Sequence, residues 1–284
     1  MGSLEGVEDP LASYEQYGRV LHDQIVDLLP PDWSWEGRRV LDFGCGAGRI
    51  LRHFLEEAAV AEFHGCDIDG PSIDWLDHEL SPPLHVFRSR EAPPLPLGTA
   101  DFDLVYATSV FTHISDLWAA WLLELHRILK PGGLLIATFH GPGMYQAVTR
   151  EQEDEDRIGM NVFNQGRSWD LGGPAVLHSR WWIRAHWGRA FEIAELRADG
   201  FAAPPGTGHG VAVMRKKAAA PSVEDLLALE QDEPREVDAL RANIEQLHRE
   251  NLRTHHWLEE LQRSPSWRLT VPLRRLKRWL QREA

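Results

Sequence analysis

Apolar and polar positions follow two different spacings along most of the chain. Helical spacing predicts helices over residues 12–29, 47–58, 71–79 and 117–129, and a packed helix around 181–187. Short apolar runs predict strands over residues 40–43, 61–68, 84–87, 102–107, 134–139, 191–196 and 210–214. Strands that alternate with helices are typical of an α/β protein with a doubly wound, mostly parallel sheet.

A glycine-rich turn follows the first of these strands. Gly44, Gly46 and Gly48 alternate with Cys45 and Ala47, directly before the predicted helix over residues 47–58. Glycines permit a tight turn and let a ligand approach the backbone, and a helix that begins there attracts an anionic group. The fingerprint for NAD and FAD places its third glycine one residue later, so the spacing disfavours these dinucleotides.

Asp42 stands two residues before the first glycine, where a carboxylate can receive an ammonium group. The turn resembles motif I of the class I S-adenosylmethionine-dependent methyltransferases. The run from Leu129 to Gly133 before an apolar strand also resembles this family. The resemblance covers roughly residues 12–140, with a weaker continuation to about 216. It implies a Rossmann-like sheet of about seven strands, closed by an antiparallel pair.

The resemblance implies a cofactor site for S-adenosyl-L-methionine. Asp42 and the turn, with Cys45 inside it, would hold the methionine end of this cofactor. Asp67 ends the second predicted strand, where an acid can accept hydrogen bonds from both ribose hydroxyls, and Ile68 follows it. Three further residues are expected to contact the cofactor: Thr108 and Ser109 after the fourth strand, and Tyr17 on the first helix. The adenine contact is expected near Ser89–Glu91, but it is not assigned to a residue.

Histidines are the candidate general bases for a hydroxyl acceptor. His113 and His140 each follow a predicted strand, and the ordinary pKa of histidine suits proton transfer near neutrality. The alternative for each is a hydrogen-bonded structural histidine. His178 and His186 lie in the variable region and are candidates for shaping the acceptor pocket. Scattered histidines predict no metal site.

Composition and charge bear on the binding partners and the location of the protein. The net charge of −13 argues against nucleic acid as a partner. No apolar run is long enough to span a membrane, the acidic amino terminus is unlike a signal peptide, and the two cysteines form no disulfide pattern. These features predict a cytoplasmic protein. Residues 141–178, with an acidic run from Glu151 to Asp156, are expected to form an irregular lid or acceptor loop.

The chain is expected to divide into four parts. Residues 1–217 form the methyltransferase-like domain, 218–234 a linker, 235–262 a coiled-coil helix and 263–284 a basic amphipathic tail. The coiled coil is predicted from a heptad pattern and would make a parallel homodimer, with Asn251 fixing the register. Its core positions are Val237, Leu240, Ile244, Leu247, Asn251, Thr254, Leu258 and Leu261. The alternative is a single helix packed on its own domain.

The tail carries a net charge of +5 over residues 264–284, against −18 for the remainder. A basic helix with a Leu/Trp face predicts peripheral contact with the inner face of a membrane, or docking on the acidic body. Residues 264–274 resemble the terminal segment of bacterial polysaccharide-assembly enzymes. The leading hypothesis is therefore O-methylation of a sugar hydroxyl in a surface glycan or its lipid-linked precursor. The alternatives are a methyltransferase acting on O, N or C of a small metabolite, and a catalytically silent scaffold.

Overall fold

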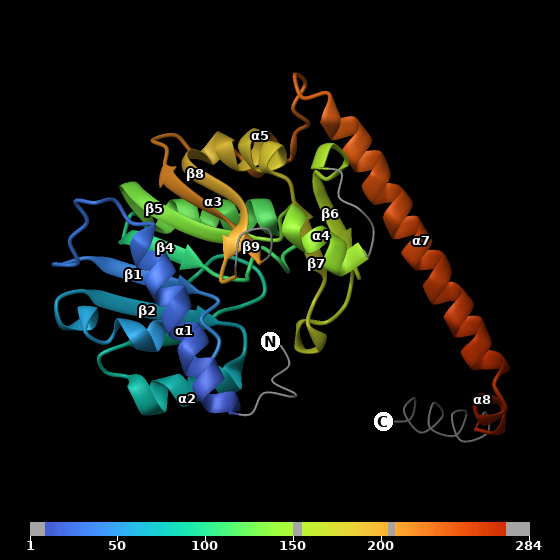
Figure 1. Ribbon diagram of the computed structural model, residues 1–284, viewed down its shortest axis with the longest axis horizontal. Coiled ribbons are helices and arrows are strands. Elements are labelled where there is room, and N and C mark those ends of the chain that lie inside the picture. Colours follow the sequence, from blue (N-terminus) through green and yellow to red (C-terminus); the bar gives the residue numbers. More distant parts are fainter. Residues whose placement is uncertain (1–8, 150–154, 204–207, 271–284) are drawn as a thin grey trace.

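The computed structural model describes residues 9–149, 155–203 and 208–270. A seven-stranded sheet runs in the order β3-β2-β1-β4-β5-β9-β8 (Figure 1). Its strands are β1 (Arg39–Phe43), β2 (Glu62–Asp67), β3 (His85–Arg88), β4 (Phe102–Ala107), β5 (Leu129–Phe139), β8 (Phe191–Phe201) and β9 (His209–Lys216). Only the pairs made by β9 are antiparallel. The predicted doubly wound, mostly parallel sheet is confirmed.

Helices cover both faces of the sheet, and the strand side chains divide between two cores. The first core packs β1, β4 and β5 against α1 (Pro10–Asp27), α2 (Gly70–Leu80) and η1 (Leu51–Phe54). The second packs the opposite face against α3 (Trp118–Ile128), α5 (Arg180–Ala190) and α6 (Val223–Leu227). Successive side chains of a strand point to opposite faces of the sheet, so Val40 lies in the first core and Leu41 in the second.

The predicted helix over residues 47–58 is wrong. The structure has turns and two short 3₁₀ helices there, η1 and η2 (Glu57–Ala59). The guanidinium of Arg52 donates through Nε to the Gly48 carbonyl and through Nη2 to the Ala47 carbonyl, at 3.0 and 2.9 Å. The Arg52 amide also donates to the Gly48 carbonyl at 3.1 Å, but the next amide, of His53, donates to Ile50, three residues back, at 2.9 Å, so the α-helical pattern does not continue. No helix dipole of useful length therefore points at the glycine turn.

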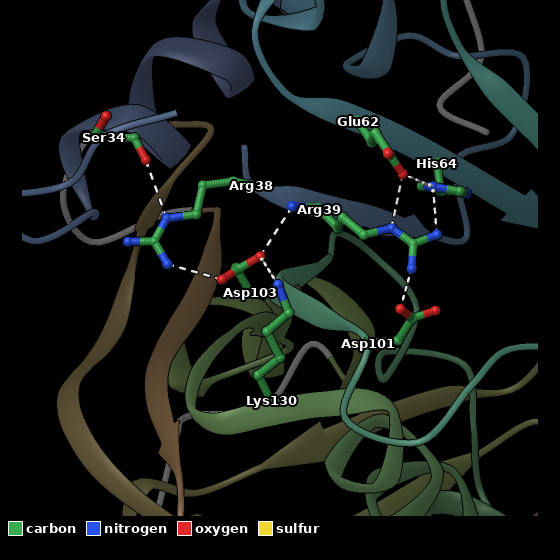
Figure 2. A network of polar contacts seen from close by, with 8 residues as sticks. All are labelled: Ser34, Arg38, Arg39, Glu62, His64, Asp101, Asp103 and Lys130. Carbon is green, nitrogen blue, oxygen red and sulfur yellow. Dashed lines mark hydrogen bonds and ion pairs between the residues drawn. The ribbon is translucent and has the colours of Figure 1, made fainter. Parts of the chain in front are cut away.

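A polar network fastens the amino ends of the strands, at the edge opposite the glycine turn (Figure 2). The Asp103 carboxylate accepts hydrogen bonds from Arg38 Nη1, the Arg39 backbone and Lys130 Nζ, at 2.8, 3.0 and 2.6 Å. Burial raises the pKa of Asp103, but these three donors outweigh burial and lower it. Asp103 thus ties the starts of β1, β4 and β5 together.

An insertion between β5 and α5 forms a second, smaller sheet. The segment contains α4 (Pro142–Thr149), η3 (Glu155–Arg157), β6 (Met160–Phe163), η4 (Trp169–Leu171) and β7 (Ala175–His178). β6 and β7 pair antiparallel, where the sequence predicted an irregular loop. Within the acidic run expected in that loop, Glu155 makes a hydrogen-bonded ion pair with Arg180. Glu151 to Asp154 of the same run lie outside the described residues.

The long helix α7 (Arg235–Arg263) packs on the insertion and then extends away from the body (Figure 1). Its docked face is mainly polar. Asn243 Oδ1 accepts from the Val162 amide and Glu250 Oε2 from the Asn164 amide, both at 2.9 Å. The buried His186 Nε2 lies 2.7 Å from Glu236 Oε1 and joins the start of α7 to α5. Residues 251–260 are exposed throughout.

The described chain ends in α8 (Pro265–Leu269). The basic residues expected to contact a membrane, Arg274 to Arg282, lie outside the described residues. Within the described ranges no helix is both long enough and apolar enough to cross a membrane.

Candidate cofactor and acceptor site

The glycine turn lies at the carboxyl end of β1, where the strand order reverses between β1 and β4. The amides of Gly44 and Cys45 both donate to the Cys66 carbonyl, at 2.8 and 3.0 Å, and dock the turn on β2. Gly46 has φ +54° and nothing within 4 Å of a Cβ built on it. A ligand can therefore approach the backbone at Gly46, as ligands do at the switch point of open α/β sheets.

Asp42 lies beneath this turn and is the most unusual carboxyl of the site. It is 2% exposed, and its Oδ2 has no hydrogen-bond partner among the described residues. Burial raises the pKa of Asp42 well above its usual range; the nearby Tyr106 hydroxyl opposes this rise, and the charge of Asp67 adds to it. An unpartnered buried acceptor costs about 1–3 kcal/mol, which a cationic or N–H donor on a ligand would offset. Asp42 thus suits an ammonium group.

Asp67, at the end of β2, shapes the turn from the other side. Its Oδ2 accepts from the Gly46 amide at 2.7 Å and its Oδ1 from the Asp69 amide at 2.9 Å. Each carboxylate oxygen retains a second lone-pair site, so the hydroxyls of a ribose can still donate to it. Ile68 follows Asp67 and lines a neighbouring cavity. Both residues therefore lie where the sequence placed them.

The helix α1 approaches the turn closely enough to exclude any side chain at Gly18. A Cβ there would lie 2.1 Å from the Arg49 carbonyl oxygen. The Arg49 guanidinium lies 5.1 Å from the ring centre of Tyr17 and 5.5 Å from that of Tyr14. Tyr17 therefore lies beside the end of the turn, and its contact with the cofactor stays a prediction. Gly18 in the middle of a helix was the available sequence signal for this close approach.

Two other predicted residues follow β4. The Ser109 amide donates to the Thr138 hydroxyl oxygen at 2.7 Å, which joins the end of β4 to β5. Thr108 and Ser109 are half-buried and Val110 packs against Gly44. The two residues are therefore at the correct edge of the sheet. Cys45 and Cys66 are buried free thiols whose pKa values burial raises, so neither is a thiolate nucleophile.

Three histidines gather at the carboxyl ends of β4 and β5. The ring of His140 lies 5.9 Å from that of His113 and 5.0 Å from that of His209. His113 Nδ1 lies 2.8 Å from the Pro174 carbonyl oxygen, on the segment that leads into β7. The structure therefore brings the two candidate bases together. His209 was missed because it opens a strand after a glycine- and proline-rich turn.

The environments of these histidines keep them neutral. Burial, with a smaller effect from neighbouring histidines, lowers the pKa of His140 to about 3 and that of His209 to about 4. Burial also lowers the pKa of His113, against the opposing hydrogen bond to Pro174. The His140 Nδ1 is buried and has no described partner. Near neutral pH each ring can therefore accept a hydrogen bond.

The other two histidines singled out from the sequence lie elsewhere. His178 is fully buried between Trp182 and Trp187, and burial lowers its pKa to about 3. His186 bonds to Leu226 and Glu236 behind the sheet. In the described ranges no three His, Cys, Asp or Glu side chains are grouped to hold a metal ion.

Comparison with known proteins bears on this geometry. A sequence family described as a methyltransferase domain matches residues 41–137, which contain the turn, Asp67 and the end of β4. This part of the chain is therefore similar to a methyltransferase domain. Its fold is that of the class I methyltransferases, and the cofactor of such domains is S-adenosylmethionine. The unpartnered Asp42 oxygen, the open backbone at Gly46 and the Asp67 carboxylate fit the ammonium, chain and ribose of that molecule.

Individual relatives cover only part of the chain. An O-methyltransferase of Pyrenophora dematioidea is 28% identical over 48% of this chain and 50% of its own length. The human arginine-hydroxylase NDUFAF5 is 30% identical over 46% of this chain and 36% of its own. The chain thus spans half or less of the length of these two relatives. A Listeria monocytogenes structure titled as an S-adenosylmethionine-dependent methyltransferase has the same fold, with a TM-score of 0.53, 14% identity and coverage of 70% of this chain and 99% of its own.

Proposed function

We propose that the protein transfers the methyl group of S-adenosylmethionine to an oxygen of its acceptor, with His113 as the general base. The observation that carries the proposal is the hydrogen bond between His113 Nδ1 and the Pro174 carbonyl, close to the cofactor turn. A carbonyl only accepts, so Nδ1 holds the proton and Nε2 holds the lone pair. A neutral imidazole fixed in this tautomer is suited to take a hydroxyl proton.

When bound, S-adenosylmethionine supplies an electrophilic methyl group on a sulfonium centre. Asp42 would receive its ammonium group, and Asp67 would accept hydrogen bonds from its ribose. His113 Nε2 would accept the hydroxyl proton while the acceptor oxygen takes the methyl group, the carbon–sulfur bond breaks and S-adenosylhomocysteine leaves. The imidazolium would then release that proton to water. Alignment of the two reactants supplies much of the acceleration in such a transfer.

His140 is the second candidate for the base. It is only 7% exposed and its pKa of about 3 makes it a weak proton acceptor. His113 is more accessible than His140, although its ring is desolvated enough to lower its pKa, so an acceptor can reach it more easily. We therefore assign proton transfer to His113, and to His140 the orientation of the acceptor through a hydrogen bond to its Nδ1.

We further propose a sugar hydroxyl of a surface glycan, or of a lipid-linked glycan precursor, as the acceptor. The support is the resemblance of residues 264–274 to the terminal segment of polysaccharide-assembly enzymes. The named relatives give no support for a glycan. A small metabolite is the second candidate, favoured by the O-methyltransferase relative. A silent scaffold is the third.

Assembly and location complete the proposal. The heptad residues Val237, Leu240, Ile244 and Leu258 are exposed on α7, so this stripe suits a second copy of the chain in a parallel homodimer. We propose that residues 1–217 form the enzyme domain, 218–234 the linker, 235–262 the dimer helix and 263–284 a basic tail. This tail would hold a cytoplasmic enzyme at the inner face of the membrane.

The test is methyl transfer from labelled S-adenosylmethionine to the glycan precursors of the host, read as label in the glycan fraction and as S-adenosylhomocysteine formed. Labelled glycan whose label survives mild base as an ether is the expected result. Label only in small metabolites would move the acceptor to the second candidate. Cofactor binding without label in any acceptor would favour the scaffold.

A further inference from the structure

A cavity of about 520 Å³ opens beside the carboxyl ends of β2 and β3. Its walls are Ile68, Arg88, Ser89, Arg90, Glu91 and Trp169. Ile68 follows β2, Arg88 ends β3 and residues 89–91 follow β3, but Trp169 comes from η4, far along the chain. The turn between β6 and β7 therefore completes a cavity that the main sheet begins.

The cavity adjoins the carboxylate that suits a ribose. Ile68 follows Asp67 directly, and the Ser89 amide donates to the Asp67 carbonyl at 2.9 Å. The Arg88 Nε donates to the Ile68 carbonyl at 3.2 Å and joins the two strand ends. A base attached to a ribose at Asp67 would consequently enter this cavity. Its walls offer apolar contact from Ile68 and Trp169, and polar groups from the residues after β3.

Local hydrogen bonds hold the backbone around Trp169. The Gly172 amide donates to the Trp169 carbonyl at 2.9 Å, and the amides of Leu171 and Gly173 donate to the Ser168 carbonyl at 3.1 and 2.9 Å. The strands on both sides are paired, and Asn243 and Glu250 of α7 bond to the β6 side. A large aromatic side chain on a turn held in this way loses little freedom when it binds a flat ligand.

Trp169 is 46% exposed although it is an apolar side chain on a well-bonded turn. Leu171 in the same turn is 63% exposed as well but is not among the residues that line the cavity, so the position of Trp169 in the cavity wall distinguishes the two side chains. Stacking against a nucleobase would use both the size and the flat face of the indole, and such stacking is tolerant of the base.

We propose that Trp169 stacks on the adenine ring of S-adenosylmethionine and sets the affinity of the protein for this cofactor. The inference rests on the proposed function only for the identity of the cofactor. Pro174, five residues further on, accepts from His113. The same turn therefore contacts the adenine through Trp169 and orients the general base, His113, through Pro174. Cofactor binding can thus affect the position of His113 beside the acceptor.

The test is calorimetric binding of S-adenosylhomocysteine to the full chain and to three variants. Trp169→Ala should weaken binding about 10-fold, and Trp169→Phe about threefold or less, because Phe keeps a stacking face. Leu171→Ala is the matched control from the same turn and should bind like the parent protein. Adenosine alone, which lacks the methionine end, should show the same fold-change for Trp169→Ala. Thermal unfolding of each variant reports whether it is folded.

Binding by Trp169→Ala within twofold of the parent protein would overturn the inference and leave the proposed function standing. Equal weakening by Leu171→Ala would overturn it too, since the loss would then come from disturbance of the turn. Absence of S-adenosylhomocysteine binding by the parent protein would instead be a failure of the proposed function. A Trp169→Ala variant that fails to fold is replaced in this comparison by Trp169→Leu, for which the same 10-fold weakening is expected.

Discussion

His113 Nδ1 and the Pro174 carbonyl oxygen lie 2.8 Å apart, which joins the end of β4 to the insertion that precedes β7. This contact fixes the tautomer of the ring and directs the lone pair of Nε2 away from the main chain. It also explains why the β6–β7 turn matters to chemistry, although this turn is remote in sequence from the glycine motif.

Replacement of His113 tests the assignment of the base. His113→Ala should lower turnover about 100-fold or more and leave affinity for S-adenosylhomocysteine within twofold of the parent protein, because proton transfer is lost and the cofactor contacts stay. His78→Ala, which removes an imidazole whose side chain is 85% exposed, is the matched control. Initial rates and calorimetry measure the two effects. Unchanged turnover in His113→Ala would transfer the role to another group.

The buried histidines should make the fold sensitive to acid. His140 and His178 have pKa values of about 3 in the folded state, below the ordinary value of 6.5. Their stabilising effect is complete above pH 6.5 and is lost as pH falls towards 3, because the unfolded chain then binds more protons. Urea unfolding between pH 7 and 4 should show a falling free energy of unfolding.

Each such histidine adds a slope of up to about 1.4 kcal/mol per pH unit. His178→Leu should therefore flatten the dependence, and His78→Ala should leave it unchanged. A free energy of unfolding that stays constant from pH 6.5 to 4.5 in the parent protein would show that these rings are not held neutral.

Asp103 should contribute to the stability of the fold, because it lies at the end of the strands opposite the cofactor turn. Asp103→Asn removes the charge that three donors share and should lower the free energy of unfolding by about 1–3 kcal/mol. Glu62→Gln also removes an Arg39 partner, but its side chain is 59% exposed and the loss should stay within about 0.5 kcal/mol. Urea titration of both variants makes the comparison. Equal losses would mean that burial of Asp103 adds nothing.

The positions of the main-sheet strands along the chain could be predicted because each contains a short apolar run. Asp42 and Asp67 followed from the same positions, since strand ends are easy to locate. The helix over residues 47–58 could not be excluded from its apolar spacing. The bonds from Arg52 to the Ala47 and Gly48 carbonyls leave no trace in hydrophobicity.

The insertion was missed for a different reason. β6 and β7 are four residues each, and their pairing is confined to one another and a single bridge from Leu177 to His140, so neither shows a long alternating pattern. Trp169 lies in the turn between them. Packing of α7 on its own domain was the alternative to the coiled coil. The residues that dock could not be identified, because Asn243 and Glu250 bond to backbone amides of the insertion and a heptad pattern reports apolar positions only. The free heptad stripe stays a prediction.

Assembly can be tested on that stripe. Ile244→Lys, which places a charge on a heptad residue that is 65% exposed, should convert a homodimer to a monomer in sedimentation equilibrium. Glu245→Lys changes a neighbouring exposed residue outside the stripe and should leave the dimer intact. A parent protein that is monomeric at high concentration would refute the dimer and leave α7 as a brace for the insertion.

The most direct test of the central claim is calorimetric binding of S-adenosylmethionine, S-adenosylhomocysteine and NAD to the full chain and to Asp67→Ala. The account predicts that both sulfur compounds bind and NAD does not. It also predicts that Asp67→Ala weakens both about 10-fold or more, because the ribose hydroxyls lose their acceptor and the Gly46 amide loses its own. NAD binding tighter than S-adenosylmethionine, or equal affinities in the parent protein and Asp67→Ala, would contradict it.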